Sequence, residues 1–160
     1  MTKDIFYDKD IFYENVEKTT LKNDNYRKVE YTHPKGMQFV LMSLKPGVEI
    51  GMEIHKDHDQ FIRIEKGDGI AQIKKGDKIK TYKLSDGFAI IIPSGTYHNI
   101  INTGKTKLKL YSVYTPPEHK DGLIQKEKPF EKIQKGGEIN MYEEKYLKYK
   151  TKYLELKNKV

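Results

Sequence analysis

Three side chains able to bind a metal ion, Glu53, His55 and Gln60, fall within the stretch GVEIGMEIHKDHDQFIRIEKG. Glu53 and His55 are two residues apart, so on an extended strand both side chains point to one face and can converge on one point. Gln60 has the same parity as Ile62, and an amide on such an aliphatic face needs a polar partner. The three residues are therefore either ligands of a metal or polar side chains on a half-exposed sheet, hydrogen-bonded to backbone, lysine or water.

The absence of cysteine restricts the chemistry of any such site. With no Cys in the sequence, disulfides, thiol chemistry and iron–sulfur clusters are excluded. A metal ion would have to be held by histidine, carboxylate or amide oxygen, and the composition is compatible with a reducing compartment.

The elements that must position these residues are short strands. From Tyr26 onward, apolar runs alternate with turns rich in Gly, Pro and Asp, and the runs are MQFVLMSL, EIGMEI, FIRI, IAQI, FAIIIP, HNIIN and LKLYSVY. Runs of this length at short intervals predict an all-β sandwich or barrel. No crossover helix fits between them, which disfavours a parallel α/β sheet.

The chain of 160 residues is long enough for one domain with tails. We expect an N-terminal arm at 1–25, a barrel at 26–118, a polar linker at 119–137 and an amphipathic helix at 138–160. The pentapeptide KDIFY occurs twice in the arm and is too short to be a structural repeat. In the last segment, Tyr, Leu and Val recur at spacings of four and three, which places them on one helical stripe. Such a helix either docks on its own domain or contacts a dimer partner.

Charge and hydropathy exclude several classes of partner. The 30 Lys and Arg exceed the 23 Asp and Glu, for a net charge of +7, but acids are interspersed among the lysines and no aromatic-interleaved basic motif is present. The charge pattern therefore disfavours nucleic acid as a partner. The polar N-terminus lacks the apolar run of a signal peptide, and no window approaches the roughly 18 apolar residues of a membrane span. We expect a cytoplasmic protein with no membrane partner.

Two motifs resemble those of the cupin family. The stretch from Gly47 to Gly67 resembles the first cupin motif, G-x5-H-x-H-x3,4-E-x6-G, with Glu53 in place of the first His and Gln60 in place of the Glu. The stretch GFAIIIPSGTYHNIIN matches the second motif, G-x5-P-x-G-x2-H-x3-N, without a departure. The resemblance implies an antiparallel jelly-roll β-barrel of cupin type, and small single-barrel cupins commonly form homodimers by exchanging edge strands.

The same resemblance implies one metal site formed by Glu53, His55, Gln60 and His98. The chain is also similar, over EIGMEIHKDHDQFIRIEKG and LYSVYTPPEHKDG, to a small bacterial cupin subfamily named after mannose-6-phosphate isomerase. Classical zinc phosphomannose isomerases bind their metal with one Gln, one Glu and two His, which are the ligand types present here with Gln and Glu exchanged. Two imidazoles, one carboxylate and one carbonyl oxygen leave a divalent ion, zinc, manganese or iron, with open positions for a ligand.

Three functions remain open from the sequence. The first is a metal-dependent isomerase acting on a small polar metabolite, a sugar or sugar phosphate. The second is a dioxygenase, because two His and a carboxylate also suit non-haem iron. The third is a binding or assembly module without turnover. No catalytic residue can be assigned, and no Lys or Arg can be placed inside the barrel as a phosphate clamp, since Arg63 has the opposite parity to Gln60.

Several other residues receive a structural interpretation. His58 lies in the HKDHD turn, off the parity of His55, and is expected to be exposed, and neither His33 nor His119 is given a role. Tyr97 is expected to pack, while Asn102 is expected to bond backbone at the end of its strand. The segment YEEKYLKYKTKYLELK is similar to C-terminal segments of proteins from mimivirus-like giant DNA viruses, which implies an addressing or assembly helix and a location in host cytoplasm or virion.

Overall fold

The computed structural model describes residues 11–33 and 35–129. The C-terminal helix predicted at 138–160 lies outside the described residues. Strands are the main secondary structure of the described chain, which has one short helix, and this confirms the predicted all-β class. Its elements are α1 (Val16–Lys22), β1 (Arg27–Thr32), β2 (Gln38–Leu44), β3 (Asp59–Lys66), β4 (Gly69–Lys75), β5 (Lys78–Leu84), β6 (Ala89–Ile92), β7 (Tyr97–Asn102), β8 (Leu108–Thr115) and β9 (Ile124–Gln125).

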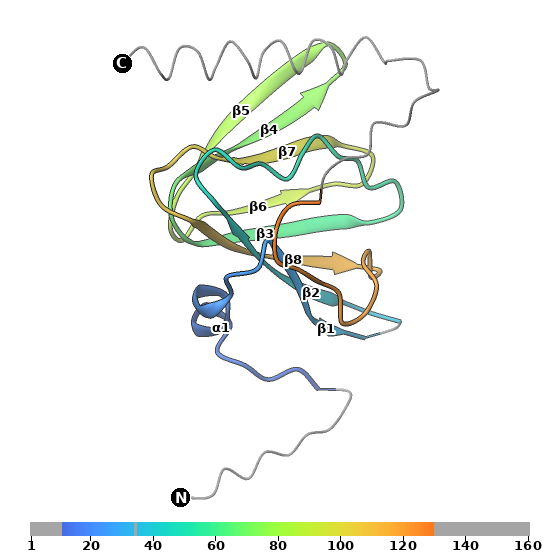
Figure 1. Ribbon diagram of the computed structural model, residues 1–160. Helices are drawn as coiled ribbons and strands as arrows, with labels where there is room; N and C mark the ends of the chain where they lie inside the picture. The colour runs from blue at the N-terminus through green and yellow to red at the C-terminus, as the bar shows by residue number, and fades with distance from the viewer. Residues whose placement is uncertain (1–10, 34, 130–160) are drawn as a thin grey trace, which may run out of the picture. The chain divides into compact units, whose positions relative to one another are not determined.

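The strands form two antiparallel sheets (Figure 1). The six-stranded sheet has the order β6-β3-β8-β2-β1-β9, and the three-stranded sheet has the order β5-β4-β7. β9 lies within the segment expected to be a linker and pairs with β1 through Arg27 and Gln125. The non-sequential orders follow from strands that cross from one sheet to the other, as in sandwiches and jelly rolls.

Alternation along the strands builds one core between the sheets. The central strand β8 shows this most clearly, because Leu110 lies opposite Met42 on one side and Ile64 on the other, and all three are fully buried. Directly opposite residues share a face and pack together. The other residues of this core are Tyr26, Val29, Val40, Leu44, Ile50, Ile62, Ala71, Leu84, Ile92, Ile100, Leu108 and Tyr114.

One expected strand is absent from the described structure. The run EIGMEI at 49–54 makes only two isolated bridges to β7, between Glu49 and Ile101 and between Glu53 and His98. Gly51 has a φ of +108°, a backbone conformation outside the extended range of a strand. The prediction of a regular strand here was wrong because the apolar pattern does not reveal a glycine that turns the chain.

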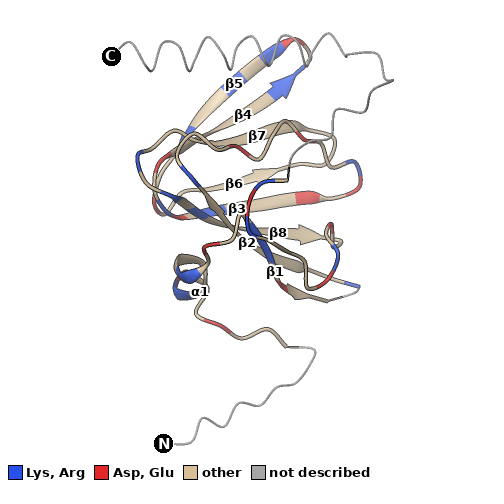
Figure 2. Ribbon diagram, in the orientation of Figure 1, with Lys and Arg blue, Asp and Glu red and all other residues tan. Residues whose placement is uncertain are grey.

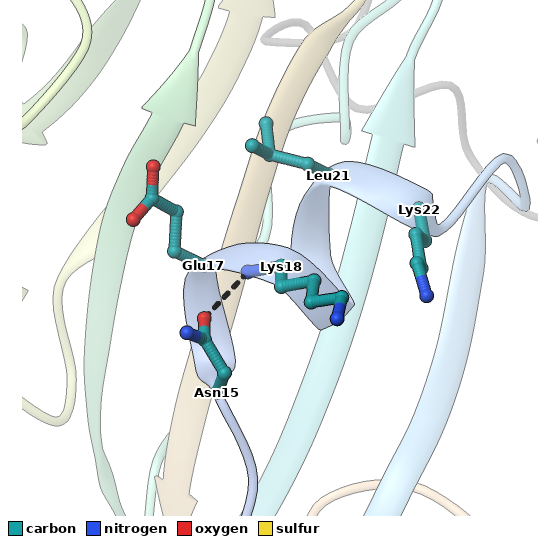
Figure 3. Close-up of a pocket in the computed structure, with 5 residues that line it drawn as sticks. All are labelled: Asn15, Glu17, Lys18, Leu21 and Lys22. Atoms are coloured by element: carbon teal, nitrogen blue, oxygen red, sulfur yellow. Dashed lines mark hydrogen bonds between the residues drawn. The ribbon is translucent and has the colours of Figure 1, made fainter.

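The arm contains a short helix that the sequence did not suggest. Asn15 caps α1, accepting a hydrogen bond from the Lys18 backbone N–H at 2.9 Å (Figure 3). Such a cap satisfies one of the free N–H groups of the first turn. After the helix, Asp24 accepts bonds from Lys107 at 2.8 Å and Lys109 at 2.9 Å, which tie the arm to the start of β8.

An aromatic cluster covers the outer face of the six-stranded sheet. Phe12, from the second KDIFY copy, lies 5.3 Å from Tyr31 and 5.0 Å from Phe39 between ring centroids. Phe39 in turn lies 4.8 Å from Tyr111. Aromatic pairs at these distances contribute beyond the area they bury, so the second copy serves to hold the arm on the sheet.

The charged residues are interspersed over the described strands and turns (Figure 2). Blue and red segments alternate along the ribbon in the way expected of a mixed, solvated surface. Among the described residues, no helix is long and apolar enough to span a bilayer.

Candidate metal centre

A pair of reciprocal backbone hydrogen bonds brings Glu53 and His98 together. The Glu53 N–H donates to the His98 carbonyl at 2.8 Å, and the His98 N–H donates to the Glu53 carbonyl at 2.9 Å. Two residues paired in this way project their side chains to the same side. His98 lies in β7 opposite Ile73, on the face that carries the core residues Ala71 and Ile100. Both side chains therefore reach the interior of the barrel.

His55 is fixed by a second backbone contact between the same two motifs. Its carbonyl accepts from the Gly95 N–H at 2.7 Å, which joins the first motif to the PSGTYH turn of the second. Gly95 has a φ of +72°, a conformation that residues with a side chain rarely adopt. The glycine of the motif is thus needed for the turn that presents His98 beside His55.

The three ligand atoms have the separations of a metal site. Glu53 Oε1 lies 3.4 Å from His55 Nε2 and 3.4 Å from His98 Nε2, and no two of the three atoms are more than 4.8 Å apart. Ligands about 2.1 Å from one tetrahedral ion are about 3.4 Å from each other. A charge-assisted N–H···O bond would be about 2.7–2.9 Å long. The observed spacing fits ligands of a shared ion better than hydrogen-bonded neighbours.

The same three atoms are buried and have no hydrogen-bond partner. His98 Nδ1 lies 2.8 Å from the Thr96 carbonyl, which can only accept, so this nitrogen carries the hydrogen and Nε2 keeps its lone pair. A metal-binding histidine is oriented in this way by a carbonyl or carboxylate on its other nitrogen. The residues present therefore fit a divalent cation.

The electrostatics of the group also suit a cation. Burial alone would raise the pKa of Glu53, but the imidazoles of His55 and His98 lower it to about 2. The carboxyl is therefore ionised over the whole physiological range. Burial opposes the charging of His55, and the Glu53 carboxylate outweighs it, so the pKa of His55 is raised. A negative carboxylate beside two imidazoles is the electrostatic environment that a divalent ion neutralises.

Gln60, the fourth ligand expected from the resemblance, lies on the interior face of β3. It is fully buried, and its Nε2 donates to Tyr114 Oη at 2.8 Å and to Ser112 Oγ at 3.2 Å. Its Oε1 is buried without a partner. The ring of Tyr114 stands edge-on to that of His55, with centroids 5.5 Å apart, and so links Gln60 to the histidines. The two hydroxyls hold the amide with its oxygen free.

A second group of residues that could hold a metal ion consists of His55, His58 and Glu118, and it shares His55 with the first group. Glu118 Oε1 lies 3.6 Å from His55 Nδ1, and Glu118 Oε2 lies 3.4 Å from His58 Nε2. A neutral imidazole has only one lone pair, so His55 cannot bind a cation through both nitrogens at once. If Nε2 faces the ion, Nδ1 carries its hydrogen toward Glu118, in the arrangement of a carboxylate that orients a metal ligand.

The expectation that His58 is exposed was wrong. The residue is 8% exposed, and its ring stacks on that of His55 with centroids 4.6 Å apart. The parity argument failed because residues 53–58 form a loop with isolated bridges and not a regular strand. Burial, followed by the neighbouring His55, lowers the pKa of His58.

Sequence reasoning also missed Tyr114, Glu118 and His119. Tyr114 is 1% exposed, and burial raises its pKa, so its hydroxyl stays protonated. Glu118 and His119 follow in the TPPEH turn, and Gln38 holds this turn over the barrel. The Gln38 Nε2 donates to the His119 carbonyl at 2.7 Å, and its Oε1 accepts from the His119 N–H at 2.8 Å. The sequence signal that could have found them is the pair of acid–base residues, Glu118 and His119, directly after two prolines.

Two other expectations can be compared with the structure. Asn102 Nδ2 donates to the carbonyls of Leu44 and Thr106, both at 2.8 Å, which confirms its role at the strand end. Arg63 Nε donates to Glu65 at 2.9 Å, away from Gln60, as its parity predicts. The hollow beside α1 drawn in Figure 3 shares no residue with the groups around His55, since it is lined by Asn15, Glu17, Lys18, Leu21 and Lys22.

Comparison with known proteins identifies the family. Residues 40–114 match the family model described as a cupin domain. The chain is 45% identical over 151 residues to protein L612 of Acanthamoeba polyphaga mimivirus, covering 94% of this chain and 92% of that protein. It is 41% identical to the crystal structure of BH2720 from Bacillus halodurans, with a TM-score of 0.69, covering 72% of this chain and 88% of that one.

A more distant relative has a named ligand. An oxalate-binding protein of Thermotoga maritima is 31% identical over 84 residues, which cover 52% of this chain and 66% of that protein. The match to the family model spans residues 40–114, which include Glu53, His55, Gln60 and His98. Sequence motifs, sheet topology and these matches agree that the chain belongs to the cupin family.

Proposed function

We propose that this cupin binds one divalent metal ion through Glu53, His55, Gln60 and His98 and takes a small polar metabolite at the positions left open on the ion. The observation that carries the proposal is the convergence of three buried, unpartnered ligand atoms, two of them 3.4 Å from the third. Unpartnered buried polar atoms are rare in folded proteins, and three facing one point suggest a missing common partner.

The finer proposal is isomerisation of a sugar or sugar phosphate. When bound, a divalent ion supplies Lewis acidity, which polarises a carbonyl oxygen. Around this site, Gln60 is fixed by two hydroxyls, and Glu118 lies 3.6 Å from His55 and 3.4 Å from His58. We expect these groups to orient the metabolite. The ligand types match those of phosphomannose isomerases, with Gln and Glu exchanged.

An iron-dependent dioxygenase is the second candidate. Two histidines and one carboxylate, as in His55, His98 and Glu53, are the ligand set of many non-haem iron oxygenases. The oxalate-binding relative supports a small oxygen-rich ligand in either case. Elemental analysis of the purified protein separates the candidates, since iron favours the dioxygenase and zinc or manganese the isomerase. A protein without bound metal would support a non-catalytic binding or assembly module.

Metal-dependent ligand binding should raise the melting temperature. A ligand that binds only the native state at 100 times its dissociation constant stabilises that state by about 2.7 kcal/mol. We expect sugars, sugar phosphates or keto acids to shift the melting temperature of the metal-loaded protein by several degrees. The shift should vanish after chelation. A complete screen without any metal-dependent shift would refute a metabolite at this ion.

Gln60 should be the most replaceable ligand. Its neutral amide oxygen is a weaker donor than imidazole or carboxylate, so Gln60→Ala should lower metal affinity less than the loss of either histidine. Gln60→Glu should keep or increase affinity because it adds negative charge, and Tyr114 and Ser112 can donate to the new carboxylate. Without metal, repulsion from Glu53 should lower its stability.

Competition titration with a chromophoric chelator measures these affinities. Gln60→Met, which keeps the length of the side chain but lacks the oxygen, is the matched control. Loss of metal from Gln60→Glu, or equal affinity of Gln60→Met and wild type, would remove Gln60 from the proposed ligand set.

A further inference from the structure

Arg27 projects into the barrel, although the sequence alone placed no cation there. It lies opposite Met42 in the pairing of β1 with β2, and Met42 is fully buried in the core. Val29, two residues further on, lies opposite the core residue Val40. Directly opposite residues of an antiparallel pair share a face, so Arg27 and Val29 both face inward.

The guanidinium of Arg27 has no charged partner among the described side chains. Its Nε is buried and makes no hydrogen bond. Its Nη1 donates to Gln125 Oε1 at 3.4 Å, the long limit of a hydrogen bond, and its Cζ lies 5.4 Å from the centroid of the Tyr26 ring. These neutral contacts leave a positive charge and a buried donor available to an acceptor.

The charge of Arg27 acts on the residues around the candidate metal centre. Burial and then the charge of Arg27 lower the pKa of His119 to about 4. The same charge acts on His55 and on Tyr114. The ring of Tyr114 stands edge-on to His55 and to His119, with centroids 5.5 and 5.3 Å away. By geometry, Arg27 lies opposite the core residue Met42, and His98 lies on the face of β7 that carries Ile100, so both side chains face the core between the sheets.

We propose that Arg27 is the anion-binding residue of this interior and that the metabolite carries a carboxylate or a phosphate group. Two carboxylates already face this space, but Glu53 lies against His55 and His98, and Glu118 lies against His55 and His58. A guanidinium presents donors in a planar fork that matches oxyanions. The inference rests on the proposed function, because other oxygens of the same metabolite would bind the metal ion at its open positions.

The test compares an anion with its neutral analogue on the full chain. Metal-loaded protein is titrated calorimetrically with glycolate, with the uncharged glycolamide and with inorganic phosphate. Wild type should bind glycolate or phosphate more tightly than glycolamide, and the stronger anion identifies a carboxylate or a phosphate ligand. Arg27→Gln should weaken the preferred anion about 10- to 100-fold, the range of a charged hydrogen bond, and leave glycolamide unchanged.

Arg63→Gln is the matched control. It removes the same charge from strand β3 of the same sheet, where Arg63 Nε donates to Glu65 at 2.9 Å, and it should bind each anion within twofold of wild type. Gln125→Glu is a second variant that keeps Arg27 intact. It places a carboxylate beside Nη1, which should compete with the bound anion and produce a similar loss.

The outcomes separate this inference from the metal proposal. The inference about Arg27 is overturned if Arg27→Gln and Gln125→Glu both bind the anions as tightly as wild type at equal metal content. It is also overturned if wild type binds none of the anions. If wild type proves to hold no metal, the titrations are made on that protein. If anion binding then requires Arg27, Arg27 is the anion-binding residue although the metal proposal fails. If anion binding does not require Arg27, both proposals fail.

Discussion

His55→Ala and His98→Ala should each strip the purified protein of metal while leaving a folded β-barrel. Each substitution removes an imidazole nitrogen that is buried and 3.4 Å from Glu53 Oε1. Imidazole is the strongest neutral donor available in a chain without cysteine. Loss of an outer-shell partner typically lowers metal affinity 10- to 100-fold, so loss of a direct ligand should lower it by at least about 100-fold.

Plasma mass spectrometry of metal per chain and circular dichroism of the strands are the two measurements. The barrel should persist because its core is formed by apolar residues that do not include the ligands. His33→Ala is the control, since His33 lies in the loop after β1 and outside both groups around His55. Full metal content in both ligand variants would disprove the site, and Glu53, His55 and Gln60 would then be polar residues on a barrel wall.

Leu110→Ala should have the largest effect on stability. Leu110 is fully buried in the central strand β8, with the fully buried Met42 and Ile64 on its two sides. Neighbours held in ladders on both sides cannot move in to fill the space, so the cavity should remain open. Substitutions of this kind lower the free energy of unfolding by about 2–5 kcal/mol, a large part of the 5–15 kcal/mol of a typical domain.

Ile91→Ala is the matched control for this substitution. Ile91 lies in the edge strand β6 and is 67% exposed, so truncating it should change the free energy of unfolding by no more than about 0.5 kcal/mol. Chemical denaturation of both variants in the metal-free form measures the difference without a contribution from ligand binding. Equal stability of the two variants would show that the region around Leu110 is loosely packed.

The two proposals make different demands on the interior. The metal centre needs neutral imidazoles and the ionised Glu53, whereas anion binding needs the permanent charge of Arg27. An arginine remains protonated at any physiological pH, so anion binding by Arg27 does not depend on the protonation of the metal ligands. This separation is what allows metal content and anion affinity to be varied independently by substitution.

The strands and the inward position of Gln60 followed from the sequence because they depend on local pattern. Short apolar runs between Gly and Pro turns predicted an all-β fold, and the resemblance to cupins predicted that its sheets are antiparallel. Parity placed Gln60 inward and Arg63 outward, and the pairing of β3 shows both. Such inferences hold wherever the backbone is a regular strand with a period of two.

Pattern failed where the backbone is not regular. Residues 49–58 alternate in sequence but form a loop with bridges, so the parity that made His58 an exposed residue did not apply. The short helix α1 depends on the local Asn15 cap, and Asp24, which follows the helix, is held by Lys107 and Lys109 across more than eighty positions of sequence. A seven-residue helix has no periodic signal long enough to predict.

By itself the sequence determined a β-barrel with cupin motifs and a chemistry limited to histidine, carboxylate and amide donors, because residue types and spacing fix both. The tertiary structure alone decided which of these groups meet. The bridge between Glu53 and His98, the hold of Gln38 on the turn with Glu118 and His119, and the inward position of Arg27 all arise from strand pairing between distant segments. Pairing register depends on the packing of the whole core, and no local window of sequence contains it.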